Sequence, residues 1–177
     1  MALNDVRATR RITDLSRLRE LEATMPMALK ILSVIGNPPQ TIKLQIKIPT
    51  AKDQRFPTIK QNQSEVRIIL PESYPLPPGP TVTFSTPIYN PNVYESGMWC
   101  FGDWSPTENL ALFVKRLMKV IALDPEIVNI ASPANRAAAT WYEQQRAVNP
   151  AQFPTIVLSN LIAEGPKKPK ITWRAIN

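Results

Sequence analysis

Apolar residues recur at every third position near the start of the chain, and this pattern predicts a helix over residues 4–22. We expect these apolar side chains to form a narrow stripe along the helix. The other sides carry many arginines, which we interpret as a solvated face or as a docking surface for an acidic partner. The apolar positions are Ile12, Leu15, Leu18 and Leu21, and the arginines are Arg7, Arg10, Arg11, Arg17 and Arg19.

Four short segments further along predict β-strands. Thr41–Ile48 alternates strictly between apolar and polar side chains, which is typical of a strand with one buried and one solvated face. It follows the apolar run Met27–Ile35 after a turn-forming sequence. Because short turns join neighbouring antiparallel strands, we expect an antiparallel meander. The two remaining strands are expected at Glu65–Leu70 and Thr81–Ser85.

Residues 86–103 have no periodicity, and helical patterns return after them. A long irregular stretch inside a compact domain usually serves a function. The sequence Ser-Pro-Thr-Glu at 105–108 has the residue types of a helix start, with Ser105 as N-cap. A second start, led by Ser132, predicts a helix over Ala134–Ala147. The pattern as a whole predicts an α+β domain.

The last residues, 151–177, differ in composition from those before them. Thr155–Ile162 is apolar enough to pack as one more short element, and a segment rich in proline and lysine follows it. We therefore expect residues 1–150 to form the body of the domain. Residues 151–177 are expected to be a C-terminal extension that packs on this body or extends from it.

Composition limits the chemistry that the chain can perform. It has 177 residues with one cysteine and no histidine, which excludes a Ser-His-Asp triad, a Cys-His pair and a histidine metal site. A lone cysteine favours a reducing cytoplasm. The net charge of +7 permits an acidic partner, but no nucleic-acid recognition motif is present. We also expect no metal, no cofactor, no secretory signal peptide and no membrane-spanning segment.

Cys100 lies in the irregular stretch just before a predicted helix, which makes it a candidate nucleophile. The alternative is a buried cysteine that acts as a small apolar residue. Without an imidazole to take its proton, the thiol would react from its own small thiolate fraction. That fraction is poor for attacking an amide but sufficient for exchange between thioesters. An amine can then attack the thioester, and the carboxamide of Asn92 or Asn90 can stabilise the oxyanion.

The order and spacing of several motifs resemble those of the ubiquitin-conjugating enzymes over about residues 4–147. Family members carry a proline-rich segment, a His-Pro-Asn motif, a cysteine eight residues after that asparagine, and a Trp-Ser-Pro sequence. This chain has Tyr-Pro-Leu-Pro-Pro at 74–78, Tyr-Asn-Pro-Asn at 89–92, Cys100 at the same spacing, Trp-Ser-Pro at 104–106 and Ser-Pro-Ala-Asn at 132–135.

The resemblance implies the family's fold, with an N-terminal helix, a four-stranded antiparallel meander, an active-site loop and two C-terminal helices. It also implies an acyltransferase. Such an enzyme accepts a ubiquitin-like protein from an ATP-dependent activating enzyme as a thioester on Cys100 and transfers it to a lysine of a target, with or without a ligase. The alternative is a non-catalytic variant that only binds a ubiquitin-like protein or a partner enzyme, and such variants lack the cysteine that this chain retains.

The resemblance also assigns roles to individual residues. Asn92 matches the family asparagine that supports the loop and stabilises the oxyanion, and Ser132 matches a residue that gates the cysteine, or else only caps a helix. Asn90 replaces the family histidine, and we favour a loop-supporting role for it over that of a second oxyanion donor. Tyr89 is expected to pack under the loop. The partner-binding surface is expected at Arg7, Arg10, Arg11, Leu76, Pro106 and Thr107.

One departure from the family concerns the segment between Cys100 and Trp104, which is shorter here than in common eukaryotic members. The shortening reshapes one wall of the site and affects the surface on which a ligase would dock. By analogy, this divergent motif indicates a bacterial ubiquitin-like conjugation system, some of which act in antiviral defence.

Overall fold

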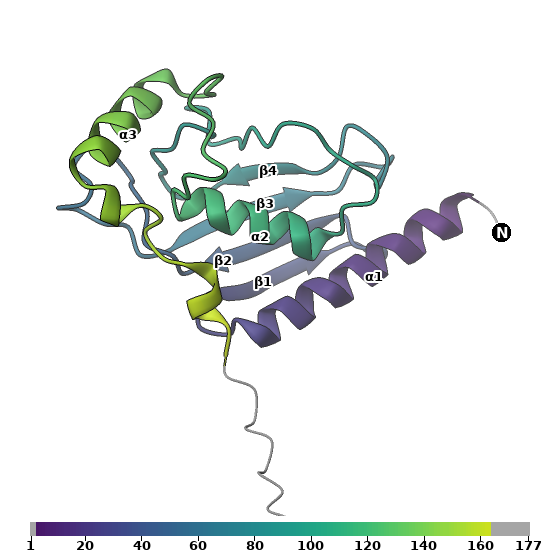
Figure 1. Cartoon of the computed structure of the whole chain (residues 1–177). Coiled ribbons are helices and arrows are strands. Elements are labelled where there is room, and N and C mark those ends of the chain that lie inside the picture. Colours follow the sequence, from purple (N-terminus) through teal and green to yellow (C-terminus); the bar gives the residue numbers. More distant parts are fainter. Residues whose placement is uncertain (1–2, 164–177) are drawn as a thin grey trace, which may run out of the picture.

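The computed structural model describes residues 3–163 of the chain. Within them, three α-helices accompany one antiparallel sheet of strand order β1-β2-β3-β4, which confirms the α+β prediction (Figure 1). None of the helices in this part of the chain is long and apolar enough to cross a membrane. The elements are α1 (Leu3–Thr24), β1 (Leu29–Ile35), β2 (Thr41–Ile46), β3 (Ser64–Ile69), β4 (Thr81–Phe84), α2 (Leu110–Ile121), α3 (Arg136–Val148) and the short 3-10 helices η1 (Pro150–Gln152) and η2 (Leu158–Leu161).

The main core lies between the sheet and α2, which covers one face of it (Figure 1). The alternation along β2 explains this, because Ile42, Leu44 and Ile46 are fully buried while Lys43 between them is exposed. On α2, the residues that are buried recur at helical spacing and include Phe113. Burying each such side chain contributes roughly 1.5–3 kcal/mol, so this contact stabilises the fold more than any local propensity.

Helix α1 does not bury all of the predicted apolar positions. Leu15, Leu18 and Leu21 are buried, but Ile12 is 53% exposed. A helix turns by about 100° per residue, so steps of three residues drift around it by about 180° over nine residues. Ile12 therefore lies on the opposite side from Leu21.

A polar residue, Asp14, is fully buried on the inner side of α1. The Tyr74 hydroxyl donates a hydrogen bond to this carboxylate, and Arg10 Nε donates to it at 2.7 Å. Burial is the main cause that raises the pKa of Tyr74. Arg10 also donates to the carbonyls of Pro106 at 2.9 Å and Glu108 at 2.6 Å. This cluster joins α1 to two loops that are far apart in the sequence.

The neighbouring Arg11 is only 6% exposed, so the prediction that it forms part of a solvated or partner-binding face is wrong. Its guanidinium donates to the carbonyls of Pro39, Leu70 and Pro71. Three carbonyl acceptors compensate the cost of burying the charge, which explains why an arginine occupies an inner position.

Both later helices start after the predicted residues. Asn109 is the N-cap of α2, since its side chain accepts from the N–H of Leu112 at 3.0 Å. Residues 105–108 form a turn instead, in which the N–H of Glu108 donates to the Ser105 carbonyl at 2.9 Å. Asn135 caps α3 in the same way, so Ser132 is not an N-cap either. Asparagine is as favourable an N-cap as serine, so the local sequence alone did not show which of the two residues caps each helix.

The described part of the C-terminal extension packs on the domain. Phe153 is buried against Tyr142, with the two ring centroids 5.0 Å apart. The backbone N–H of Thr155 donates to the Ala122 carbonyl, and that of Ala163 donates to the Thr24 carbonyl, both at 2.8 Å. The predicted short element corresponds to η2. The segment rich in proline and lysine lies outside the described residues.

The revised start of α2 can be tested by substitution. Asn109→Ala removes the cap and is expected to lower the free energy of unfolding by about 1 kcal/mol, whereas Ser105→Ala is expected to cost less than about 0.5 kcal/mol. Urea unfolding followed by circular dichroism measures both. A larger loss in Ser105→Ala than in Asn109→Ala would contradict the assignment.

Candidate active site

A tight hairpin brings Asn92 and Cys100 together. The N–H of Cys100 donates to the Asn92 carbonyl at 2.8 Å, and Val93 pairs with Trp99 across the hairpin. The eight-residue spacing between Asn92 and Cys100 is thus the length that the chain needs to reverse direction in this hairpin. The reversal uses Gly97 at φ +83°, where a side chain would stand 3.0 Å from the Phe84 carbonyl of β4.

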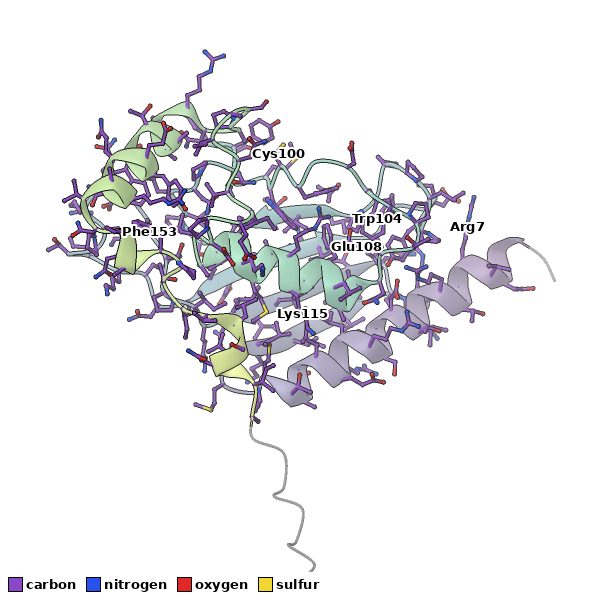
Figure 2. The ribbon with its side chains drawn as sticks, viewed as in Figure 1. Arg7, Cys100, Trp104, Glu108, Lys115 and Phe153 are labelled. Atoms are coloured by element: carbon purple, nitrogen blue, oxygen red, sulfur yellow. The ribbon has the colours of Figure 1, made fainter. Side chains whose placement is uncertain are left out.

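Cys100 is a free cysteine of intermediate exposure, so it is not a fully buried core residue. In Figure 2 it lies above α2, in the loop that also approaches α3. A cavity of about 340 Å³ adjoins it. The residues that line this cavity are Asn92, Trp99, Cys100, Phe101, Gly102, Arg116, Val120, Ile127, Asn129, Ser132 and Ala134. The structure therefore brings Cys100, Asn92 and Ser132 to one place.

The Asn92 carboxamide supports the segment that follows α2. Its Nδ2 donates to the Ile127 carbonyl at 3.3 Å, and its Oδ1 accepts from the N–H of Asn129 at 3.0 Å. The residue is 8% exposed. Because the bond to Ile127 is long for an amide donor, the Nδ2 group can exchange it for another acceptor in the cavity at small cost.

Asn90 is fully buried and does not line the cavity. Its Nδ2 donates to the Val120 carbonyl at 2.7 Å, and its Oδ1 accepts from the N–H of Asn92 at 2.9 Å. Asn90 therefore links the hairpin to the end of α2. This geometry favours the loop-supporting role over that of a second oxyanion donor, because both carboxamide atoms are engaged and the residue does not line the cavity.

Ser132 is exposed at the rim of the cavity. Its backbone N–H donates to Asn129 Oδ1 at 2.9 Å. Nearby, the N–H groups of Ala134 and Asn135 donate to the Pro91 carbonyl at 2.8 and 3.1 Å, respectively. The start of α3 is thereby tied to the same hairpin, and this bond network places Ser132 beside Cys100.

Two residues near the thiol were not recognised from the sequence. Tyr94 in the hairpin is 41% exposed, and a hydrogen bond with Cys100 is the main cause that raises its pKa. Arg116 on α2 lines the cavity. The sequence could have placed Tyr94 near Cys100, because Tyr94 lies only two residues after Asn92. Nothing in the local sequence distinguishes Arg116 from other helical arginines. Tyr89, expected under the loop, packs its ring on Trp141 of α3 at 5.3 Å.

The predicted partner-binding residues lie at the other end of α2. Leu76 is 45% exposed, Thr107 is exposed, and Arg7 and Pro106 are half-buried. Trp104 holds their loops together, because its Nε1 donates to the Pro75 carbonyl at 2.6 Å (Figure 2). Arg10 belongs to the internal cluster with Asp14, as described above.

A model of the ubiquitin-conjugating enzyme family matches residues 17–154. Because this match covers more than half of the 177 residues, the chain belongs to the ubiquitin-conjugating enzyme family.

Curated relatives support this membership. A probable ubiquitin-conjugating enzyme E2 of Encephalitozoon cuniculi is 35% identical over 101 residues, which are 47% of this chain and 43% of the relative. Ubiquitin-conjugating enzyme E2 2 of Debaryomyces hansenii is 38% identical over 80 residues, which are 43% of this chain and 45% of the relative. The chain thus spans less than half the length of these relatives.

Solved structures share the fold. Saccharomyces cerevisiae Ubc12 superimposes with a TM-score of 0.57 at 20% identity, covering 79% of this chain and 77% of that one. Human ubiquitin-conjugating enzyme E2 G1 superimposes with a TM-score of 0.50 at 18% identity, covering 65% and 96%. The fold implied by the motifs is therefore confirmed.

The supporting role of Asn90 generates a stability prediction. Asn90→Ala leaves the Asn92 N–H unpaired in a buried region, while the Val120 carbonyl keeps its bond from the Leu123 N–H at 3.0 Å. We therefore expect a loss of about 2 kcal/mol in the free energy of unfolding. The exposed Asn129→Ala serves as the matched control, with an expected loss below about 1 kcal/mol. Equal losses in the two variants, measured by urea unfolding, would contradict the assigned role.

Proposed function

We propose that the chain carries a ubiquitin-like protein as a thioester on Cys100 and transfers it to a lysine of a target protein. The observation that supports this most is a half-buried thiol at a cavity that also receives the Asn92 carboxamide. Family membership favours the same reaction.

The first step is an exchange between two thioesters. The Cys100 thiolate attacks the carbonyl carbon of the modifier's C-terminal thioester on an activating enzyme, which forms the new S–C bond, and the thiolate of the activating enzyme leaves. Bond energies are nearly balanced, so the thiol needs no imidazole. This fits a chain without histidine.

The second step is aminolysis. A neutral lysine amine attacks the thioester carbon, the Cys100 thiolate leaves, and the excess proton on nitrogen passes to solvent. Negative charge develops on the carbonyl oxygen, where Asn92 Nδ2 can donate after releasing the Ile127 carbonyl. Ser132 lines the cavity that the incoming amine would enter, and this position supports a gating role for it.

The carrier chemistry can be measured without knowing the modifier. In one arm the protein is mixed with a diglycine thioester, and in the other with ubiquitin, its activating enzyme and ATP. We expect an adduct of one acyl group that thiol reductant removes and that Cys100→Ala abolishes, as seen by intact mass and non-reducing electrophoresis. Cys100→Ser should retain the acyl group as a more stable oxygen ester, because an alkoxide leaves less readily than a thiolate.

The alternative is a non-catalytic variant that only binds a ubiquitin-like protein or a partner enzyme. Absence of any reductant-sensitive adduct in both arms would favour it. The presence of Cys100 at the cavity supports the enzyme instead, since a binding module has no use for an accessible thiol there.

Asn92→Ala separates the two steps. We expect normal loading of Cys100 but a discharge to free lysine that is about 10²–10³ times slower, because an oxyanion donor is lost. Loading is followed on non-reducing gels, and discharge is followed after the activating enzyme is stopped. Slow loading with normal discharge would contradict the role of Asn92.

Partner surfaces and cellular context are part of the same proposal. Arg7, Leu76, Pro106 and Thr107 form the surface on which we propose that the activating enzyme or a ligase docks. We further propose a cytoplasmic bacterial conjugation system with an antiviral role, from the short segment after Cys100. Neighbouring genes for an activating enzyme, a ubiquitin-like protein and a deconjugating protease would support this context.

A further inference from the structure

Arg116 is a charged residue at the thioester cavity that the proposed steps do not use. Among the described residues that line the cavity, it is the single charged one. Its side chain is 28% exposed, and its Nε atom is buried with no hydrogen-bond partner among residues 3–163. An incompletely paired guanidinium beside a reactive thiol calls for an explanation, because burying it costs free energy.

The guanidinium holds the backbone that directly follows the thiol. Arg116 Nη1 donates to the Phe101 carbonyl at 3.1 Å, and Nη2 donates to Glu108 Oε2 at 3.0 Å. The backbone of Glu108 is in turn held by Arg10 at 2.6 Å. The planar guanidinium of Arg116 thus connects α2 with the turn before it and with the residue after Cys100.

The same group lies among aromatic rings on both sides of the thiol. Arg116 Cζ is 5.7 Å from the ring centroid of Trp99, 5.9 Å from that of Phe101 and 5.5 Å from that of Phe113. Trp99 precedes Cys100 and Phe101 follows it. Cation–π attraction therefore adds to the hydrogen bond in holding these neighbours in place.

Apart from Arg116, the segment after the thiol is held by the Phe101 ring, which packs on Trp99 and Phe113 with ring centroids 5.5 and 5.2 Å apart. Gly102 has φ +75°, and a side chain placed on it would meet no atom within 4 Å. Gly102 and Asp103 are both exposed. Arg116 is therefore the side chain that anchors the backbone of this segment, through the Phe101 carbonyl.

We propose that Arg116 is a positioning residue of the thioester site: its fork on the Phe101 carbonyl fixes the direction of the Cys100 side chain toward Asn92. This inference rests on the proposed function. Arg116 also places a fixed positive charge at the cavity where the oxyanion develops. A lysine would keep the charge but, as a single point, could not bridge Phe101 and Glu108 in the same way.

Single-turnover discharge of the diglycine thioester on Cys100 to free lysine tests the proposal. We expect Arg116→Met to load normally and to lower the maximal discharge rate at least about 10-fold, because small misplacement of a reacting atom costs this much. The lysine concentration at half-maximal rate should stay unchanged, since Arg116 does not contact the amine. Arg116→Lys should discharge faster than Arg116→Met and more slowly than the unaltered protein.

Two matched variants exclude simpler causes. Lys115→Met removes a positive charge from the adjacent position, on the side of α2 away from Cys100 (Figure 2), and should discharge normally. Phe153→Leu destabilises the fold from a distant aromatic cluster and should also discharge normally per folded molecule. Thermal unfolding of every variant shows that the measurements are made on folded protein.

Three results would overturn the role of Arg116 alone. These are a maximal rate of Arg116→Met within about twofold of the unaltered protein, an equal loss in either control, or a change confined to the half-saturating lysine concentration. Failure of the unaltered protein to form any thioester would instead refute the proposed function, and this inference with it.

Discussion

The hydrogen bond from the Cys100 N–H to the Asn92 carbonyl is the contact on which the site depends. It closes the hairpin, and so it converts an eight-residue separation into direct contact between the thiol residue and a carboxamide residue. Gly97 makes the closure possible, because only a residue without a side chain fits against the Phe84 carbonyl. Asn90 then anchors the hairpin to α2 through Val120. The backbone of Cys100 is thus positioned by hydrogen bonds within the hairpin and behind it.

The lack of histidine is compatible with this arrangement. The Asn90 carboxamide bridges a carbonyl and an N–H. Any neutral side chain with one donor and one acceptor can form such a bridge. Such a bridge has no proton to exchange near neutral pH, so the loop should keep its geometry over a wide pH range. The proposed transfer of an acyl group from sulfur to nitrogen would rely on a good leaving group and on fixed donors, not on a general base.

A second network serves the opposite end of the domain. Buried Asp14 accepts hydrogen bonds from Arg10 and Tyr74. Arg10 also donates to the carbonyls of Pro106 and Glu108. This fixes the loops that carry the exposed Leu76 and Thr107. Glu108 belongs to both regions, since its carboxylate binds Arg116 at the cavity. The surface proposed for partners and the proposed thioester site therefore share one rigid support.

Periodicity and motif order were sufficient to predict the element order, the meander and the approach of Asn92 to Cys100, because these depend on local patterns and on a short hairpin. The contacts between residues that are distant in the sequence were decided by the tertiary structure alone. Arg11 is buried because three carbonyls from other segments accept its hydrogen bonds. Asn109 caps α2 because Arg10 and Trp104 hold the preceding turn outside the helix. Arg116 lines the cavity beside Cys100 only because α2 packs beneath the hairpin. Each of these positions depends on long-range partners, which no local pattern specifies.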